Sequence, residues 1–487
     1  NGGILDMNKS LVKNSVFYMI YNILNMLFPF LTSMHVARVI LPTDIGEIAY
    51  AQNIVSYFSI LAFLGIPTYG VREIAKARDS KNELSAVFSE LFLINFISSV
   101  VFSFAYYILI FITPSFRENM ALYSVMGITV ILNMLNISWL YEGLEEFGFI
   151  SLRNAVFKLI MFMLVIFSVR SRQDVLRYVT ITVLGVAGNN IINVVHANNY
   201  IRFQKNNLNL IRHLRSIFIL AAVNLAIEIY TLIDTTMLGI MSTKEHVAFY
   251  YYASKINKIL LQITNTVTMV LVPRISLYYK ENRICEFNQL LTKTLKIIII
   301  ASVPMIIGLQ FTSDFLFSHL FGSSYIVSAS VERILCFVLV ISPVGYLLGS
   351  RVMLVSNNEP KMAICVGMGA IVNIVGNYFL IRRYNEFGAA IASVISESIV
   401  MLMYIYQGKK IFRLYEFEAT IFKVCIAGIS EIAVLLFCSQ ILHENWGKIL
   451  TEVISASCVY IASLALLGES VTREYVSRIL NRIMPKV

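Results

Sequence analysis

Polar side chains recur at helical spacing inside apolar stretches of this sequence, and their types suit the binding of hydroxyl groups. Tyr50, Asn53 and Tyr57 follow one another at steps of three and four residues, which places them on one face of a helix. Amides and phenols both donate and accept hydrogen bonds, so they pair well with hydroxyl-rich ligands. Lipid offers such a stripe no hydrogen-bond partner, so we expect it to face protein or water.

A second set of polar residues adds positive charge to this chemistry. Lys255, Lys258 and Gln262 lie in one apolar run at steps of three and four residues, and an ammonium group attracts phosphate-type anions. Both lysines lie near the end of their run, so for Lys258 an interfacial position and ligand binding remain open alternatives. Arg38 and Arg72 follow other apolar runs, where each can meet an anionic ligand or fix the orientation of the chain.

Amides and carboxylates occupy further positions inside apolar runs. Asn25 belongs to a polar stripe in the first run, and Asn224 and Glu228 share a face in the seventh, with Asp234 at its flank. A carboxylate in such a place costs about 2.5–3.5 kcal/mol on insertion scales, so we expect Glu228 and Asp234 to pair with lysine or to exchange a proton or cation. For any single Asn, a hydrogen bond between adjacent helices is the alternative.

The composition indicates the kind of structural element that carries these residues. The 487 residues are 57% hydrophobic and 14% charged, with a mean hydropathy of +0.73, which is typical of a polytopic membrane protein. At roughly 20 apolar residues per crossing, the length admits about 12 to 14 helices. The net charge of +10 is in the loops, where it follows topology, so no nucleic-acid partner is expected. The six cysteines and six histidines show no paired spacing, and we expect no disulfide, metal or cofactor.

Apolar runs of spanning length predict an all-helical fold with about fourteen transmembrane helices. Basic residues, such as Lys76 and Lys410, are concentrated in alternate loops and at both ends of the chain. This asymmetry predicts that both termini lie in the cytoplasm and that the number of spans is even. The runs are centred near residues 11–37, 46–66, 84–111, 120–140, 149–169, 178–200, 214–240, 247–272, 293–311, 326–355, 361–381, 387–407, 418–440 and 448–467.

A weak internal repeat predicts two equivalent lobes. The segment that begins at Tyr50 aligns with the segment that begins at Tyr252, and Pro67 and Pro273 each close the helix before a basic loop. Halves that contain an even number of spans run in the same sense, as parallel repeats, with a substrate cavity between them.

The repeat predicts the domain organisation. We expect an N-lobe at residues 1–212 with spans one to six, and a C-lobe at residues 213–408 with spans seven to twelve. Residues 409–487 would hold the last two spans and a basic amphipathic tail that docks on the anionic inner leaflet.

Several segments of the chain resemble a known family. The sequences RVILPTDIG from Arg38, IDTTMLG from Ile233, YYASKI from Tyr251 and VLVPRIS from Val270 resemble those of the Wzx-type oligosaccharide flippases. These form the polysaccharide-transport branch of the multidrug/oligosaccharidyl-lipid/polysaccharide exporter superfamily. The resemblance implies a flippase that carries undecaprenyl-pyrophosphate-linked repeat units across the bacterial cytoplasmic membrane by alternating access, for capsule, O-antigen or exopolysaccharide assembly. It implies membrane lipid, a polysaccharide polymerase and a chain-length regulator as partners.

Other functions remain open at this point. A peptidoglycan-precursor flippase or a multidrug exporter of the same superfamily would have a similar architecture. A membrane polysaccharide polymerase or acyl transferase is disfavoured, because the expected outer loops are short and offer only residues such as Asp314 and His319. The sequence has no GxxxxGK[ST] loop, which argues against ATP hydrolysis by this chain. We therefore expect a transporter and no enzyme.

Overall fold

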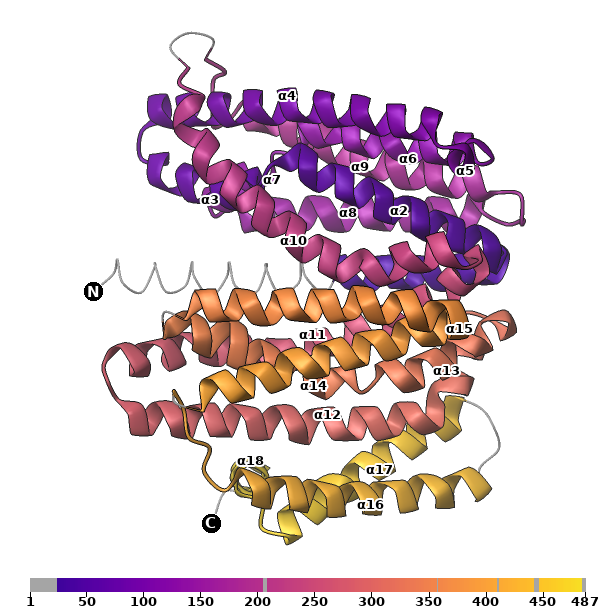
Figure 1. Ribbon diagram of the computed structural model, residues 1–487, viewed down its shortest axis with the longest axis vertical. Coiled ribbons are helices and arrows are strands. Elements are labelled where there is room, and N and C mark those ends of the chain that lie inside the picture. The colour runs from indigo at the N-terminus through magenta and orange to yellow at the C-terminus, as the bar shows by residue number, and fades with distance from the viewer. Residues whose placement is uncertain (1–23, 205–207, 357, 410, 442–445, 484–487) are drawn as a thin grey trace. The chain divides into compact units, whose positions relative to one another are not determined.

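The computed structural model describes residues 24–204, 208–356, 358–409, 411–441 and 446–483. Within these ranges every regular element is a helix, and the chain forms two compact units, Asn1–Ala248 and Phe249–Val487, whose boundary falls inside one long helix (Figure 1). Ten described helices are long and apolar enough to cross a membrane, or eleven if one bent pair counts as a span. The expected all-helical polytopic fold is confirmed, whereas the number fourteen and the lobe boundaries stay predictions.

The first unit starts, in its described part, with a helix over residues 24–39. Two further members of the polar stripe that includes Asn25, Tyr18 and Asn22, lie outside the described residues. The remaining elements are α2 (Pro42–Phe63), α3 (Ile66–Ala77), α4 (Lys81–Ile112), α5 (Pro114–Arg117), α6 (Met120–Leu132), η1 (Asn133–Leu135), α7 (Ser138–Gly143), α8 (Phe147–Ser168), α9 (Val175–Ala197), α10 (Ile211–Met241) and the start of α11 (Lys244–Lys280).

The second unit contains the rest of α11 and the elements that follow it. One of them, α15, is a hairpin, because its backbone leaves helical geometry at Asn385 (φ 46°, ψ −124°). Its two arms touch where Asn373 donates to Oγ of Ser396 at 3.4 Å. The elements are α12 (Ile284–Leu320), η2 (Ser323–Tyr325), α13 (Ile326–Leu335), α14 (Val338–Tyr346), η3 (Leu347–Met353), α15 (Glu359–Gly408), α16 (Phe417–Ile441), α17 (Trp446–Leu466) and α18 (Ser470–Ile483).

The break between α2 and α3 follows from local sequence. Leu64 and Gly65 both have positive φ, 50° and 76°, and Pro67 occupies the first turn of α3, where its missing N–H costs nothing. A Cβ on Gly65 would lie 2.8 Å from the backbone nitrogen of Ala221. Glycine therefore permits both the turn and the close approach of α10.

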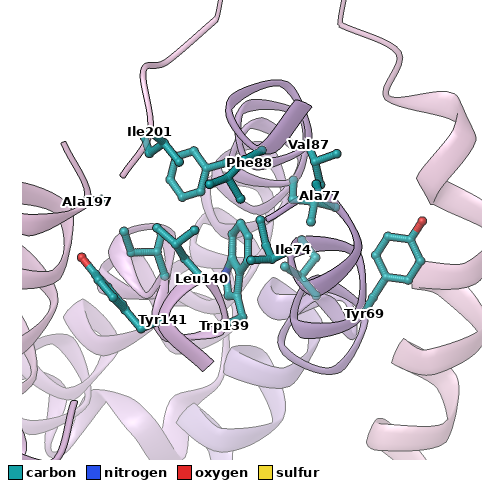
Figure 2. Packing of buried hydrophobic residues seen from close by; sticks show 14 of the residues in the cluster. Tyr69, Ile74, Ala77, Val87, Phe88, Trp139, Leu140, Tyr141, Ala197 and Ile201 are labelled. Carbon is teal, nitrogen blue, oxygen red and sulfur yellow. The ribbon is translucent and has the colours of Figure 1, made fainter. Parts of the chain in front are cut away.

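The first unit is held together at one end by a buried aromatic cluster. The Trp139 ring is stacked on Phe88 with centroids 5.4 Å apart, and it lies beside Ile74, as Figure 2 shows. Tyr69 points away from Trp139 in this view, and its hydroxyl meets Nδ1 of His213, on α10, at 2.8 Å. The cluster thus ties α3, α4 and α7 together, and Tyr69 extends the contact to α10.

The second unit has two buried clusters along α12. One includes Phe287, Leu291 and Leu295 of α12 and residues of α14, η3 and α15. The other includes Val424 of α16 and Tyr460 of α17. α12 contributes to both clusters and is 37 residues long. At about 1.5 Å per residue, it extends beyond a hydrocarbon core of about 30 Å.

Candidate functional site

The stripe on α2 faces α10 within the first unit. Asn53, 7% exposed, donates to the carbonyl oxygen of Leu232 at 3.3 Å, and the hydroxyl of Tyr57 lies 2.8 Å from Oγ1 of Thr236. The expectation that this stripe faces protein or water is confirmed for these two residues.

Both carboxylates expected in the seventh run lie near this stripe. Glu228 and Asp234 are half-buried on α10, the helix that Tyr57 contacts at Thr236. The two acids that the sequence proposed for ion coupling therefore lie on the helix that packs against the stripe. Their coupling role stays a prediction, as does the binding role of half-buried Asn224 on the same helix.

A cation inside a spanning helix, which the sequence analysis did not identify, adds a further candidate residue. The ammonium of Lys158, on α8, donates to the main-chain oxygen of Asn25 at 3.2 Å and to its side-chain oxygen. Both side chains are half-buried. The available signal was that Lys158 is the one charged residue in the apolar stretch 155–169. A cation held beside an amide can bind an anion and a hydroxyl at adjacent points.

A second missed cation lies one and a half turns before Lys158 on α8. Arg153 is 6% exposed, donates from Nε to Oδ1 of Asn189 at 2.8 Å, and lies over the ring of Phe149 at 5.4 Å. These contacts join α8 to α9, so Arg153 has a structural role whatever ligand the unit binds.

A buried acid, Glu47, anchors the start of α2. Tyr123 donates to one of its carboxylate oxygens, and the ammonium of Lys244 lies 3.8 Å from the other. The same ammonium lies 3.5 Å from the centre of the Tyr50 ring. Tyr50, the first residue of the predicted stripe, thus takes part in a network that fixes the end of the helix.

The two arginines of the predicted site are at its margins. Arg38 is exposed. Arg72 is also exposed, donates to Glu73 at 3.1 Å and lies over the Tyr69 ring at 5.1 Å. A role of either arginine in ligand binding stays a prediction.

In the second unit the predicted residues lie along one stretch of α11. Lys255 is half-buried with its ammonium 5.3 Å from the centre of the Tyr251 ring, and Lys258 and Gln262 are exposed on the surface of this unit. Asn257 is buried instead and donates to Glu332 at 3.3 Å and to the carbonyl oxygen of Leu335 at 2.9 Å. The helix thus buries Asn257 in the unit and leaves Lys258 and Gln262 on its surface.

Among the described residues, no three His, Cys, Asp or Glu side chains are grouped as a metal site. The arrangement described above suits reversible binding of a polar, anionic ligand through ammonium, amide and hydroxyl groups.

Comparison with known proteins gives a family match over more than half of the chain. The profile of the family described as "Polysaccharide biosynthesis protein" matches residues 11–279. A protein of Escherichia coli (strain K12) whose name describes it as an O-antigen transporter is 23% identical over 416 residues, which cover 82% of this chain and 98% of that protein. The capsular polysaccharide biosynthesis protein CapF of Staphylococcus aureus is 24% identical over 426 residues, covering 82% and 100%.

Solved structures share the fold. The lipid II flippase MurJ in an inward closed conformation superposes with a TM-score of 0.69 at 15% identity, covering 93% of this chain and 98% of that one. An inward-facing multidrug-resistance transporter of the MATE family gives a TM-score of 0.59 at 13% identity, covering 81% and 94%.

Proposed function

The chain belongs to the polysaccharide biosynthesis protein family, and on that premise we propose that it is a flippase for lipid-linked oligosaccharides. Its substrate would be an undecaprenyl-pyrophosphate-linked repeat unit, moved across the bacterial cytoplasmic membrane for capsule, O-antigen or exopolysaccharide assembly. The names of the two relatives, a fold shared with a lipid II flippase and the many spanning helices support this proposal.

The observation that carries the proposal is the contact between Lys158 and Asn25. A lysine at the middle of a membrane helix costs about 2.5–3.5 kcal/mol on insertion scales, and such residues are retained mainly where they line a polar path. Its partner is a neutral amide, so the positive charge is not neutralised by this contact. The pyrophosphate of a lipid-linked sugar would supply the missing negative charge.

We assign the other residues to roles that their chemistry allows. Cations would attract the pyrophosphate, amides and phenols would bind sugar hydroxyls, and the two acids of α10 would couple transport to a proton or cation gradient. The transport cycle would be alternating access, with both termini in the cytoplasm. The proposed set is Lys158, Lys255, Lys258, Asn25, Asn53, Tyr57, Asn224, Gln262, Arg38 and Arg72 for the substrate and Glu228 and Asp234 for the ion.

Reconstitution tests this function directly. Purified protein in proteoliposomes should move an undecaprenyl-pyrophosphate-linked oligosaccharide from one leaflet to the other, measured by the accessibility of the sugar to an external enzyme. Lys158→Met should slow the exchange by about 10- to 100-fold, the value of one charged hydrogen bond, and Lys158→Arg should retain most of it. Lys361→Met, at an exposed position, is the matched control and should behave as wild type. Equal rates in protein-free vesicles would contradict the proposal.

The fold shared with MurJ supports a second candidate, a flippase for peptidoglycan precursors. Rescue of a bacterial strain depleted of its own precursor flippase would favour this candidate. Rescue of a strain that lacks its O-antigen or capsule flippase would favour the first. A polymerase and a chain-length regulator would then be the proposed partners in the same membrane.

A further inference from the structure

A loop of the first unit docks on α4 through two hydroxyl groups. Oγ of Ser85 accepts from the backbone nitrogen of Arg202 at 3.1 Å, and Oγ of Ser89 accepts from that of Gln204 at 2.8 Å. The acceptors are one helical turn apart and the two amides are two residues apart.

The second unit repeats this arrangement on α12. Oδ1 of Asn288 accepts from the backbone nitrogen of Arg413 at 2.9 Å, and Oγ1 of Thr292 accepts from that of Tyr415 at 3.3 Å. The spacing of four residues between acceptors and two between amides is the same. The two units thus dock their loops by one device, which supports the internal repeat expected from the sequence.

The residues that follow the second acceptor, on α4 and on α12, differ in charge between the units. In the first unit the buried carboxylate of Glu90 comes directly after Ser89 and is bound by the backbone nitrogen of Asn209 at 2.7 Å, by Arg212 and by His213. Its negative charge is therefore fully satisfied within the protein.

In the second unit the residues after Thr292 are cationic. Lys293 follows directly and donates to Glu474 of α18 at 2.6 Å. Lys296, one turn further along, is 6% exposed. No acceptor lies within hydrogen-bond distance of its ammonium among the residues that the structure describes. Lys296 also lines a cavity, so a ligand bound there can supply an acceptor for its ammonium.

A cavity lies where that acceptor would be. It has a volume of ≈ 370 Å³, against about 30 Å³ for one water molecule. It opens at the end of the unit where α12 begins, between α12, the loop before α16 and the first turns of α18. Its charged lining consists of Lys293 and Lys296, with Glu474 held by Lys293 and by Arg478 at 2.7 Å, and the exposed Glu416.

We propose that this cavity binds the phosphate group of an anionic phospholipid, with the Lys296 ammonium as its main contact. The polar groups of Gln289, Thr292 and Ser470, which also line the cavity, would bind the remaining headgroup oxygens. The amphipathic α18 forms one wall, and such helices lie at the level of lipid headgroups. This places a lipid phosphate within reach of the cavity. The inference does not depend on which substrate the protein transports.

Native mass spectrometry of the purified full-length chain tests this site with three probes, phosphatidylglycerol, phosphatidylcholine and inorganic phosphate. Wild-type protein should bind phosphatidylglycerol more tightly than phosphatidylcholine. Lys296→Met should weaken that binding by about tenfold, which is typical for one charged hydrogen bond. Lys296→Arg should retain binding, and Lys280→Met, which removes an exposed cation at the end of α11, should have no effect.

Two results would overturn the proposal. The first is equal affinity for both lipids, with no loss of binding in Lys296→Met. The second is binding of inorganic phosphate that phosphatidylglycerol does not compete away, because this would assign the site to a soluble anion. If Lys296→Met does not fold, wild-type protein still decides the matter. Cys285 lines the cavity and is exposed, so phosphatidylglycerol should slow its alkylation more than phosphatidylcholine does.

Discussion

The carboxylate of Glu90 and the imidazole of His213 form a buried hydrogen bond of 2.7 Å, which joins α4 to the start of α10. The other ring nitrogen of His213 meets the hydroxyl of Tyr69 on α3 at 2.8 Å. Three helices are therefore connected through one imidazole. Arg212 also binds the carboxylate, so the pair resists the loss of any single contact.

Replacing this carboxylate should destabilise the first unit. Glu90→Gln removes the acceptor charge from Arg212, His213 and the amide of Asn209, and we expect a loss of about 1–3 kcal/mol. The midpoint of thermal unfolding in detergent measures it. Glu83→Gln, exposed on the same helix, should leave the midpoint unchanged, and an equal shift in both variants would contradict the central role of Glu90.

The turn at Gly65 gives a second prediction. Gly65→Ala introduces a Cβ at φ 76° and 2.8 Å from the backbone of α10, so we expect a loss of about 1–3 kcal/mol in the same unfolding measurement. Gly148→Ala is the matched control, because no atom lies within 4 Å of the added Cβ and Gly148 is inside helix α8. That control should be neutral or stabilising by up to about 1 kcal/mol. A stable Gly65→Ala variant would show that the break is not under steric constraint.

The contact between α12 and α18 should depend on pH. The hydrogen bond from Lys293, with the nearby charges of Lys293 and Arg478, lowers the pKa of Glu474 from its ordinary value of 4.5. A carboxyl whose folded pKa is lowered stabilises the docked helix at pH above its unfolded pKa, and this stabilisation is lost as the pH falls through the folded pKa.

A nitroxide label on a cysteine introduced at Ser477 reports the docking. Its mobility should be low at neutral pH and rise as the pH falls below about 4.5. In Glu474→Gln the mobility should be high at every pH. A pH profile identical in both proteins would assign the docking to the apolar contacts of Val471 instead, which is buried at the start of α18.

Ion coupling through α10 makes a functional prediction. Neutralising both acids, Glu228→Gln with Asp234→Asn, should leave flipping in proteoliposomes insensitive to an imposed proton or sodium gradient, since the groups that would bind the ion are gone. Glu118→Gln, at an exposed position between α5 and α6, should keep the response of the wild type. If transport by the double variant responds to the gradient as strongly as transport by the wild type, the hypothesis is wrong.

The helices were predictable because long apolar runs need no knowledge of tertiary contacts. Adjacent residues on a helix do not face each other, so Glu332 and Arg333 need separate partners. The structure provides them, with Asn257 at 3.3 Å from Glu332 and Asp314 at 2.7 Å from Arg333. Which partners they are was beyond reach, because contacts such as Asn257 to Glu332 join residues 75 positions apart.

The site was predictable only in part, and Lys158 shows why. Polar stripes identify residues that share a helix face, which is how Asn53 and Tyr57 were found. A lone lysine in an apolar run belongs to no stripe, and its pairing with Asn25 spans 133 positions. The spacing of residues along one helix does not show which face of a neighbouring helix lies opposite them.

The hairpin of α15 has a mechanical consequence. Its arms are joined at Asn385 with no linker between them and touch again at Asn373 and Ser396. Neither arm can slide far along the other, so a displacement of one arm also moves the other. During a transport cycle we expect the two arms to tilt together as one rigid body.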